Sequence, residues 1–577
     1  MEFFEREYRR FLESGVLTEE ERAQLLSIEN DREAKALRFS SPMDFGTAGL
    51  RSTMYMGLGC MNRLTVAMTT KGLAALVKKE KGEARGVVIA YDSRNNSSAF
   101  ARVSAEVLAF AGIRVYIFNA LRPTPELSFA LRHLGAIAGI NITASHNPKE
   151  YNGYKAYWED GAQLSPEQAA IVKEESLCFD VLDDSGRMPY GEALAKGLIT
   201  ELCEDFDEEY LAAVMKTAVD ADAVREVADT LRVVYTPLHG AGCRLVPLVF
   251  ERMGLRRLYT VDAQMQPDGD FPTVKKPNPE YAEVFGLGRE IADRVGSDLI
   301  IATDPDADRV GVMARNKEGA FVTVSGNRMG ALLLDYIIRK KKELGTLPAK
   351  PYCVKSIVST DMASRIAAVH GIALYDVLTG FKFIGEVIKN QEKEGNAEGF
   401  LLGFEESYGY LGGAYARDKD AVEASMLILE MTADYKKRGM TLIDALDALF
   451  ETYGHFGEGM TDIYMEGLDG IEKRKALMQS LRSKPPKTFG GYAVHRLGDY
   501  LAGTFTDLAS GEREETGLPF SDVICFVLEN GDKIIVRPSG TEPKVKLYFL
   551  ASGEDRESLD TKLSAYKRDA LSLVNES

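Results

Sequence analysis

The sequence lacks paired cysteines, long apolar runs and an excess of positive charge. Its six cysteines are scattered without any Cys-x-x-Cys pair: Cys60, Cys178, Cys203, Cys243, Cys353 and Cys525. This pattern favours reduced thiols that serve only in packing. No apolar run approaches the roughly 20 residues that a membrane span needs. The start, Met1 to Glu7, has no basic region followed by an apolar core, so we expect an unexported, cytoplasmic protein with no membrane partner.

The charge balance excludes another class of partner. The chain has 70 Lys+Arg against 87 Asp+Glu, a formal net charge of -17, which argues against a nucleic-acid or anionic-membrane surface. Apolar residues make up 45% of the 577 residues, with 26 Phe and 25 Tyr. That is ample core material, which favours a folded chain over a disordered one, and the length allows about four domains.

Three carboxylates at alternate positions, Asp304, Asp306 and Asp308, are followed at once by Arg309. They come after the apolar run 298–302, which predicts a buried strand that ends at the first of them. Ligands bind at this edge of open α/β sheets, and three oxygen-rich side chains suit a hard cation such as Mg²⁺. The alternative is a solvated acidic turn.

A second polar segment, residues 143–148, ends the apolar stretch 137–142 and reads Thr-Ala-Ser-His-Asn-Pro. Ser145 is therefore expected at the tip of another strand. Serine is a weak nucleophile unless a base or a metal assists it, and His146 and Lys155 are nearby in the chain. The alternative is an ordinary capped loop, because spacing alone does not bring residue 145 to residue 304.

The apolar runs follow a repeating order along the chain. Residues 86–91, 231–236 and 352–357 each lead through a short turn into a helical pattern, the βα alternation of parallel sheets. Near the end, runs 522–528 and 533–537 flank Asn530-Gly531, a hairpin signal. We therefore predict a helical extension (1–40), three α/β domains (41–205, 206–320 and 321–455), and a hinge with an α+β domain (456–577).

In these motifs the chain resembles the α-D-phosphohexomutases, specifically their phosphoglucomutase branch. Four motifs match in the family's order: Thr143 to Pro148 (phosphoserine loop), Asp304 to Arg309 (metal loop), Gly403 to Ser407 (sugar loop) and Arg537 to Thr541 (phosphate-binding loop). Supporting matches are Gly46 to Arg51, Phe271 to Val274 and Pro277 to Pro279. An ordered set of four is far more specific than any one motif.

The resemblance implies three similar α/β domains with mixed sheets and a smaller C-terminal α+β domain around a central cleft. Ser145 would carry the transferable phosphoryl group and complete a Mg²⁺ site with the three aspartates. Arg309 would be a fixed cation beside it. His146 or Lys155 would move a proton to or from the sugar, with Lys155 favoured because burial can lower a lysine pKa.

The resemblance also implies a substrate site. Its residues would be Arg51, Glu405, Ser407, Lys419, Arg537, Ser539, Gly540 and Thr541. Glu405 and Ser407, spaced by two, would share a face of an extended loop and hold two sugar hydroxyls. The last four would grip the phosphate that is not transferred. Some mannose-type relatives carry a histidine where this chain has Gly409, which favours the glucose-type branch.

The implied activity is the interconversion of α-D-glucose 1-phosphate and glucose 6-phosphate through glucose 1,6-bisphosphate, which also serves as activator. Sugar phosphates are then the partners of a monomer or weak homodimer. Alternatives on the same fold are phosphopentomutase and phosphomannomutase activities. A metal-dependent sugar phosphatase and a non-catalytic sugar-phosphate sensor come from other classes.

Overall fold

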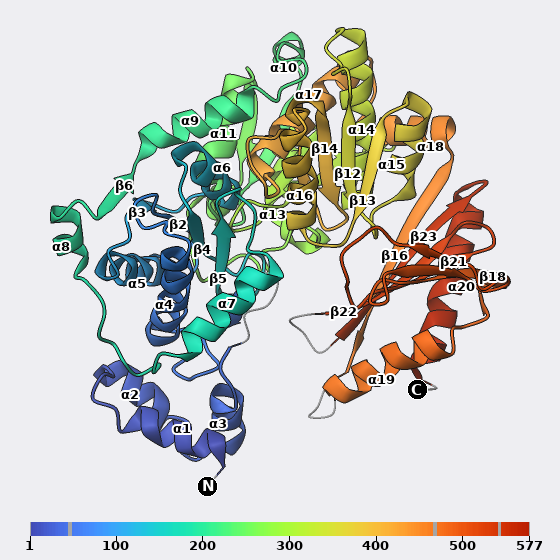
Figure 1. Ribbon diagram of the computed structural model, residues 1–577. Helices are drawn as coiled ribbons and strands as arrows, with labels where there is room; N and C mark the ends of the chain where they lie inside the picture. The colour runs from blue at the N-terminus through green and yellow to red at the C-terminus, as the bar shows by residue number, and fades with distance from the viewer. Residues whose placement is uncertain (1, 44–48, 466–469, 540–543, 576–577) are drawn as a thin grey trace. The chain divides into compact units, whose positions relative to one another are not determined.

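The computed structural model describes residues 2–43, 49–465, 470–539 and 544–575. The chain forms two compact units (Figure 1). The first contains residues 1–315, 319–323 and 409–439, and the second contains 316–318, 324–408 and 440–577. Within the described residues, no helix is long and apolar enough to cross a membrane. All six cysteines are free, as their spacing predicted.

The first sheet of the first unit is mixed, in the order β1-β5-β4-β2-β3-β6. Its strands are β1 (Leu50–Thr53), β2 (Val87–Tyr91), β3 (Val115–Phe118), β4 (Ala138–Ile142), β5 (Tyr151–Trp158) and β6 (Ile199–Leu202). Strand β2 is apolar throughout because both of its faces are buried. Val87 and Ile89 join one buried cluster, while Val88 and Ala90 join another on the opposite face, as expected for a parallel strand covered on both sides.

Helices cover both faces of this sheet. They are α4 (Arg63–Lys79), α5 (Ser97–Phe110), α6 (Thr124–Leu134), α7 (Pro166–Leu177) and α8 (Tyr190–Ala195). The region expected to be a helical extension contains three short helices, α1 (Phe3–Leu12), α2 (Glu19–Leu26) and α3 (Arg32–Phe39). Helix α2 begins with a capping box, in which Thr18 and Glu21 exchange hydrogen bonds, a strong local start signal.

The second sheet of this unit has the order β11-β10-β9-β7-β8. Its strands are β7 (Arg232–Thr236), β8 (Arg257–Thr260), β9 (Leu299–Thr303), β10 (Val310–Arg315) and β11 (Phe321–Val324). The helices of this region are α9 (Glu204–Met215), α10 (Ala223–Glu226), α11 (Gly242–Arg252), α12 (Asp262–Met265), η1 (Ala282–Phe285) and α13 (Gly286–Val295). Strand β15 (Gly409–Leu411) and helix α17 (Ala421–Lys437) also belong to the first unit.

The second unit begins with parallel strands in the order β13-β12-β14. They are β12 (Tyr352–Ser356), β13 (Ala373–Val377) and β14 (Phe400–Glu405), and their helices are α14 (Gly326–Glu343), α15 (Asp361–His370), α16 (Phe381–Lys393), η2 (Ala397–Gly399) and α18 (Leu442–Tyr453). The predicted sugar loop, Gly403 to Ser407, includes the last three residues of β14.

The C-terminal part of the second unit is an antiparallel sheet with two helices. Its strands are β16 (His455–Tyr464), β17 (Thr488–Phe489), β18 (Tyr492–Asp499), β19 (Thr504–Asp507), β20 (Arg513–Glu515), β21 (Ile524–Leu528), β22 (Lys533–Pro538) and β23 (Lys544–Gly553), and its helices are α19 (Gly470–Ser483) and α20 (Arg556–Asn575). Strands β21 and β22 form the predicted hairpin, with Gly531 at φ +85. The segment expected to include a hinge contains β16 and α19.

The predicted fold class is confirmed. The α/β regions contain mixed sheets, and the C-terminal region has an antiparallel sheet. Every strand predicted from an apolar run is present in the described chain, within two residues at either end.

Candidate active site

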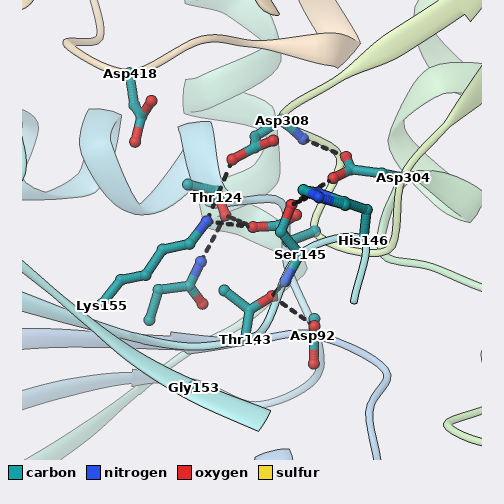
Figure 2. Close-up of polar contacts among 12 residues, drawn as sticks. Asp92, Thr124, Thr143, Ser145, His146, Gly153, Lys155, Asp304, Asp308 and Asp418 are labelled. Atoms are coloured by element: carbon teal, nitrogen blue, oxygen red, sulfur yellow. Dashed lines mark hydrogen bonds and ion pairs between the residues drawn. The ribbon is translucent and has the colours of Figure 1, made fainter. Parts of the chain in front are cut away.

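Ser145 lies immediately beyond β4 in a strained loop. Its φ is +53, a left-handed conformation that is uncommon for residues other than glycine. The Ser145 N–H donates to Thr143 Oγ1 at 2.8 Å, and Thr143 Oγ1 donates to Asp92 Oδ2 at 2.6 Å. Figure 2 shows this chain of contacts beneath the serine. The loop is thus held in an unusual shape by its own buried hydrogen bonds, which is typical of functional sites.

The three aspartates follow β9 in a tight turn and are fully buried. One oxygen from each lies within 4.8 Å of the others. Asp304 Oδ1 accepts the backbone N–H groups of Asp308 and Arg309 at 3.0 Å. Asp304 Oδ2 accepts the Ser145 hydroxyl at 2.8 Å. The structure therefore joins the two sequence motifs that spacing alone did not connect (Figure 2).

The remaining oxygens of this metal triad, Asp304, Asp306 and Asp308, are arranged for a cation. Asp306 Oδ2 and Asp308 Oδ2 each contact a lysine, whereas Asp306 Oδ1 and Asp308 Oδ1 are buried with no hydrogen-bond partner in the described chain. A buried carboxylate oxygen without a partner is costly. Hard oxygen donors at this spacing are the ligands that Mg²⁺ prefers. The donor set therefore fits a divalent cation.

Two lysines face the triad. Lys155 Nζ, from β5, lies 2.7 Å from Asp306 Oδ2 and 3.2 Å from Asp308 Oδ2. Lys419 Nζ lies 2.8 Å from Asp308 Oδ2. Although burial alone would raise it, the pKa of Asp308 is held far below its usual range by Lys419 and Lys155. Burial and the charges of the other two aspartates raise the pKa of Asp304 well above its usual range.

The expected lowering of the Lys155 pKa is wrong. Burial acts in that direction, but the carboxylates of Asp306 and Asp308 outweigh it and raise the pKa. The sequence argument counted burial beside a cation and missed that two anions face this lysine. Attraction to a nearby opposite charge favours the charged form of a buried group.

His146 lies beside the serine, and Arg309 lies beside Asp308 of the triad. His146 Nδ1 is 3.1 Å from Ser145 Oγ. Burial and the charges of Arg309 and Arg51 lower the pKa of His146 well below its usual value. Arg309 Nη1 contacts Glu280 Oε1 at 2.6 Å, while its Nε is 3.9 Å from Asp308 Oδ1. Arg309 is thus oriented by an ion pair in addition to its place beside the triad.

Arg51 lies on β1, opposite Gly153 of β5. Its Nη1 donates to Asn147 Oδ1 of the serine loop at 3.0 Å. The preceding motif residues 46–48 lie outside the described residues. Within the first unit, the structure therefore brings together Ser145, His146 and Lys155 with the triad, and places Arg51, Arg309 and Lys419 beside them.

The sugar-loop residues lie in the second unit. Glu405 Oε1 accepts the Gly380 N–H at 2.7 Å, and Glu406 Oε2 accepts the Ser356 hydroxyl at 3.2 Å. The loop is a turn rather than the extended segment we expected, with Tyr408 at φ +67. Burial and the Glu405 carboxylate raise the pKa of Glu406 to about 7. Ser407 lies within this turn.

The phosphate-loop residues are described only in part. Arg537 lies on β22 opposite Lys546, and the Ser539 N–H donates to the Lys544 carbonyl at 2.9 Å. The Ser539 carbonyl accepts Arg474 Nη1 at 2.9 Å. Gly540 and Thr541 lie outside the described residues.

Four family domains match the chain in order. "Phosphoglucomutase/phosphomannomutase, alpha/beta/alpha domain I" matches residues 42–177, domain II matches 208–319, domain III matches 325–453, and the C-terminal domain matches 492–561. The chain belongs to the phosphoglucomutase/phosphomannomutase family. The predicted resemblance is thereby confirmed.

Individual relatives agree with this membership. The chain is 36% identical over 527 residues to a phosphoglucomutase of Staphylococcus saprophyticus, covering 91% of this chain and 94% of that one. It is 37% identical over 528 residues to one of Staphylococcus epidermidis, covering 91% and 93%.

Solved structures share the fold at low identity. The Paramecium phosphoprotein pp63/parafusin, a phosphoglucomutase, has a TM-score of 0.67 at 18% identity, covering 93% of this chain and 95% of that one. A phosphoglucomutase/phosphomannomutase family protein from Burkholderia thailandensis has a TM-score of 0.64 at 18% identity, covering 92% and 97%. These two matches support the fold.

Our sequence reasoning about this family member missed the residues that hold the serine loop from below. Arg94, fully buried, donates to the carbonyls of Ser145 and Asn147 at 2.5 Å, and to those of Pro148 and Tyr151 at 2.9 and 3.0 Å. It follows strand β2 in the order Asp92-Ser93-Arg94. The rule that found Ser145 and Asp304, polar residues at a strand end, would have found Arg94 too.

A second missed residue supports the triad. Thr124, the first residue of α6, donates from Oγ1 to Asp306 Oδ2 at 2.7 Å and from its N–H to the Asp306 carbonyl at 2.8 Å. Asn141 Nδ2 in turn donates to Thr124 Oγ1 at 2.6 Å. These contacts fix Asp306 Oδ2, while Asp306 Oδ1 has no hydrogen-bond partner in the described chain. Residues that hydrogen-bond to metal ligands commonly orient them in this way. No spacing rule links residues 124 and 306.

Proposed function

We propose that this protein is a phosphoglucomutase that interconverts α-D-glucose 1-phosphate and glucose 6-phosphate. The observation that carries the proposal is the contact between Ser145 Oγ and Asp304 Oδ2 at 2.8 Å within the metal triad. It places a hydroxyl that could carry a phosphoryl group against three buried carboxylates. The Staphylococcus relatives named as phosphoglucomutases support the choice of reaction.

The triad would hold Mg²⁺ through Asp304, Asp306 and Asp308, with a phosphoryl oxygen on Ser145 as a further ligand. When bound, the cation neutralises charge on the phosphoryl group during transfer. Asp306 Oδ1 and Asp308 Oδ1 support this assignment, because both are buried without a hydrogen-bond partner in the described chain.

The protein's own groups would do the rest. Ser145 gives its phosphoryl group to the bound monophosphate and later receives the other one, so that glucose 1,6-bisphosphate is formed in between. Lys155 Nζ and His146 Nδ1 are the candidates for moving a proton to or from the reacting sugar hydroxyl. Arg309, paired with Glu280, would present positive charge to the transferred group.

Recognition would fall to the residues that the family resemblance implies. Glu405 and Ser407 would hold sugar hydroxyls. Arg51, Lys419, Arg537, Ser539, Gly540 and Thr541 would bind the sugar phosphate. Gly409, in place of the histidine of mannose-type relatives, favours glucose over mannose, while a pentose phosphate remains the second candidate substrate.

We further propose the organisation given by the sequence: an extension of residues 1–40, α/β domains at 41–205, 206–320 and 321–455, and a hinge with an α+β domain at 456–577. Cytoplasmic location and a monomer or weak homodimer stay predictions. Size-exclusion chromatography with light scattering measures the oligomeric state directly.

The deciding experiment separates a mutase from a phosphatase and a sensor. Dephosphorylated enzyme should be nearly inactive on glucose 1-phosphate, because an unmodified serine has nothing to donate to a monophosphate. A trace of glucose 1,6-bisphosphate should restore activity to wild type but not to Ser145→Ala. Intact mass should show a phosphate adduct on the wild type and on the exposed control Ser185→Ala, but not on Ser145→Ala.

Two results would reject the mutase. One is full activity from demonstrably unphosphorylated enzyme without bisphosphate. The other is inorganic phosphate as the main product, which would leave a phosphatase. Comparing kcat/KM for glucose 1-phosphate, mannose 1-phosphate and ribose 1-phosphate then fixes the substrate.

A further inference from the structure

The N-terminal helices α1 to α3 lie outside the four matched family domains, the first of which begins at residue 42. They nevertheless share a buried core with the first unit (Figure 1, blue). Phe11, Leu25 and Phe39 pack in one cluster with Met56 and Leu58. The last two belong to residues 54–62, the β1–α4 loop. The extension is therefore packed against the loop that follows the strand of Arg51.

Backbone contacts join the extension to this loop. The Gly59 N–H donates to the Arg38 carbonyl at 2.8 Å, and the Met56 N–H donates to Gln24 Oε1 at 2.5 Å. At Gly57, φ is +154 and a Cβ atom would lie 2.7 Å from the Arg38 carbonyl oxygen. Such a close approach of two backbones requires glycine. Helices α2 and α3 thus hold this loop at defined points.

An ion pair closes the same contact at the start of α4. Arg63 Nε and Nη2 donate to the two carboxylate oxygens of Glu21 at 2.8 and 3.0 Å. Arg63 Nη2 also donates to the Val16 carbonyl at 2.6 Å. Both side chains are mostly buried, at 20% and 18% exposure. A bidentate arginine–carboxylate pair fixes geometry as well as distance.

The loop is in turn bonded to the strand that carries Arg51. The Met61 N–H donates to the Thr53 carbonyl at 3.0 Å, and Ser52 Oγ donates to the Gly59 carbonyl at 2.8 Å. Strand β1 is the edge strand of its sheet and pairs with β5 alone in the described chain. An edge strand lacks a second neighbour to fix it. The loop supplies that support from the other side.

We propose that the N-terminal extension positions Arg51 for phosphate binding by holding the β1–α4 loop. The contacts described above lead from the extension through the loop to Arg51, whose Nη1 donates to Asn147 Oδ1 of the serine loop. Residues 2–43 act as positioning residues and touch no substrate. The kinetic part of this inference rests on the proposed function, whereas its structural part does not.

The test uses point variants of the full chain, because deleting the extension would expose its core and could prevent folding. The variant Glu21→Gln/Gln24→Leu removes the ion pair and the acceptor for Met56. Gln24→Glu keeps that acceptor and should behave like wild type. Glu2→Gln is the matched control, because it removes an exposed ion pair with Arg32 within the same extension.

The first readout is amide hydrogen exchange. In the double variant, the amides of Met56 and Gly59 should exchange about fivefold to tenfold faster than in wild type, as expected for the loss of a net hydrogen bond. Both Glu2→Gln and Gln24→Glu should leave these rates unchanged. Unchanged exchange in the double variant would overturn the inference.

The second readout is binding. The double variant should raise KM for glucose 1-phosphate by about threefold to tenfold, with a smaller change in kcat. Its affinity for inorganic phosphate, measured by calorimetry, should fall by about the same factor. In an Arg51→Ala background the same change should have no further effect, because the two act through one group. An equal effect in that background, or no effect on either constant, would overturn the inference.

Failure of the proposed function is distinguishable from failure of this inference. If wild type converts no sugar phosphate, the mutase proposal fails, while exchange and inorganic phosphate binding still decide whether the extension positions Arg51.

Discussion

Two buried groups of carboxylates in the first unit have opposite surroundings. The metal triad faces Lys155 and Lys419 at 2.7 to 3.2 Å. The second group, Asp420 and Glu423 at the start of α17, is bonded to neutral groups. Asp420 accepts the hydroxyls of Tyr210 and Tyr415, and Glu423 accepts the Gly412 N–H. The two groups are equally buried, yet only the triad faces lysines.

The difference appears in their pKa values. Lys155 holds the pKa of Asp306 below its usual range against burial, whereas burial and the charge of Asp420 raise the pKa of Glu423 to about 8. A buried acid without a cation is neutralised by a proton instead. Burial of acids therefore does not identify a site. The cations facing them do.

The largest expected effect is on the triad itself. Asp306→Asn removes one negative charge at nearly constant shape, so activity should fall by roughly a thousandfold while the fold survives. Steady-state kinetics over a Mg²⁺ titration and circular dichroism check this. Glu423→Gln is the control and should keep most activity. Normal turnover and Mg²⁺ dependence in Asp306→Asn would show that the two groups are equivalent.

Removing a cation should cost both activity and stability. Lys155→Met leaves the carboxylates of Asp306 and Asp308 without their shared partner, which for buried ion pairs costs about 3–5 kcal/mol. Activity should fall by about a hundredfold. Urea unfolding in the absence of added metal measures the loss, and added Mg²⁺ should recover part of it. A loss under about 1 kcal/mol, which is the size expected for an exposed ion pair, would mean that Lys155 does not stabilise the triad.

A smaller effect is expected at the sugar loop, which belongs to the other unit. Glu405→Gln should lower kcat/KM by about tenfold to a hundredfold, because a charged acceptor for a hydroxyl becomes neutral. Ser145 should still be phosphorylated, as intact mass would show. Loss of the phosphate adduct in a folded Glu405→Gln protein would contradict the separation of sugar binding from phosphoryl transfer.

The smallest effect concerns Glu423 and appears as a pH dependence of stability. Its pKa is higher in the folded protein than in the unfolded chain, so its contribution is greatest below about pH 4 and declines up to about pH 8, by about 1.4 kcal/mol per pH unit at most. Glu423→Gln should flatten that part of the profile, so the variant should gain stability relative to the wild type as the pH rises from about 5 to 8. Urea midpoints between pH 5 and 8 test this, and an unchanged slope would mean that Glu423 is ionised.

Local patterns predicted the strands and the residues at their ends. Apolar runs located β2, β4, β7, β9 and β12, and the same rule placed Ser145 and the triad at strand ends. What the sequence did not contain was the distance between chain segments. The approach of Lys419 to Asp308, and of Thr124 to Asp306, depends on packing between elements more than 100 residues apart.

Electrostatics was the other limit. The direction of the Lys155 pKa could not be predicted, because it depends on which of two opposing effects is larger at one point in space. The sugar loop became a turn for a comparable reason. At Gly326 a Cβ atom would lie 2.1 Å from the Glu406 carbonyl oxygen, so helix α14 packs against the loop backbone in a way that no local pattern encodes.

The left-handed backbone at Ser145 has an evolutionary consequence. A non-glycine residue in this conformation costs about 1–2 kcal/mol, which glycine would recover. Ser145→Gly should therefore unfold at a higher temperature than Ser145→Ala, although neither has a hydroxyl. Selection for thermal stability alone would favour glycine at residue 145, whereas the proposed phosphoryl transfer requires a serine. The serine is thus a position where natural selection keeps the protein less stable than its fold allows.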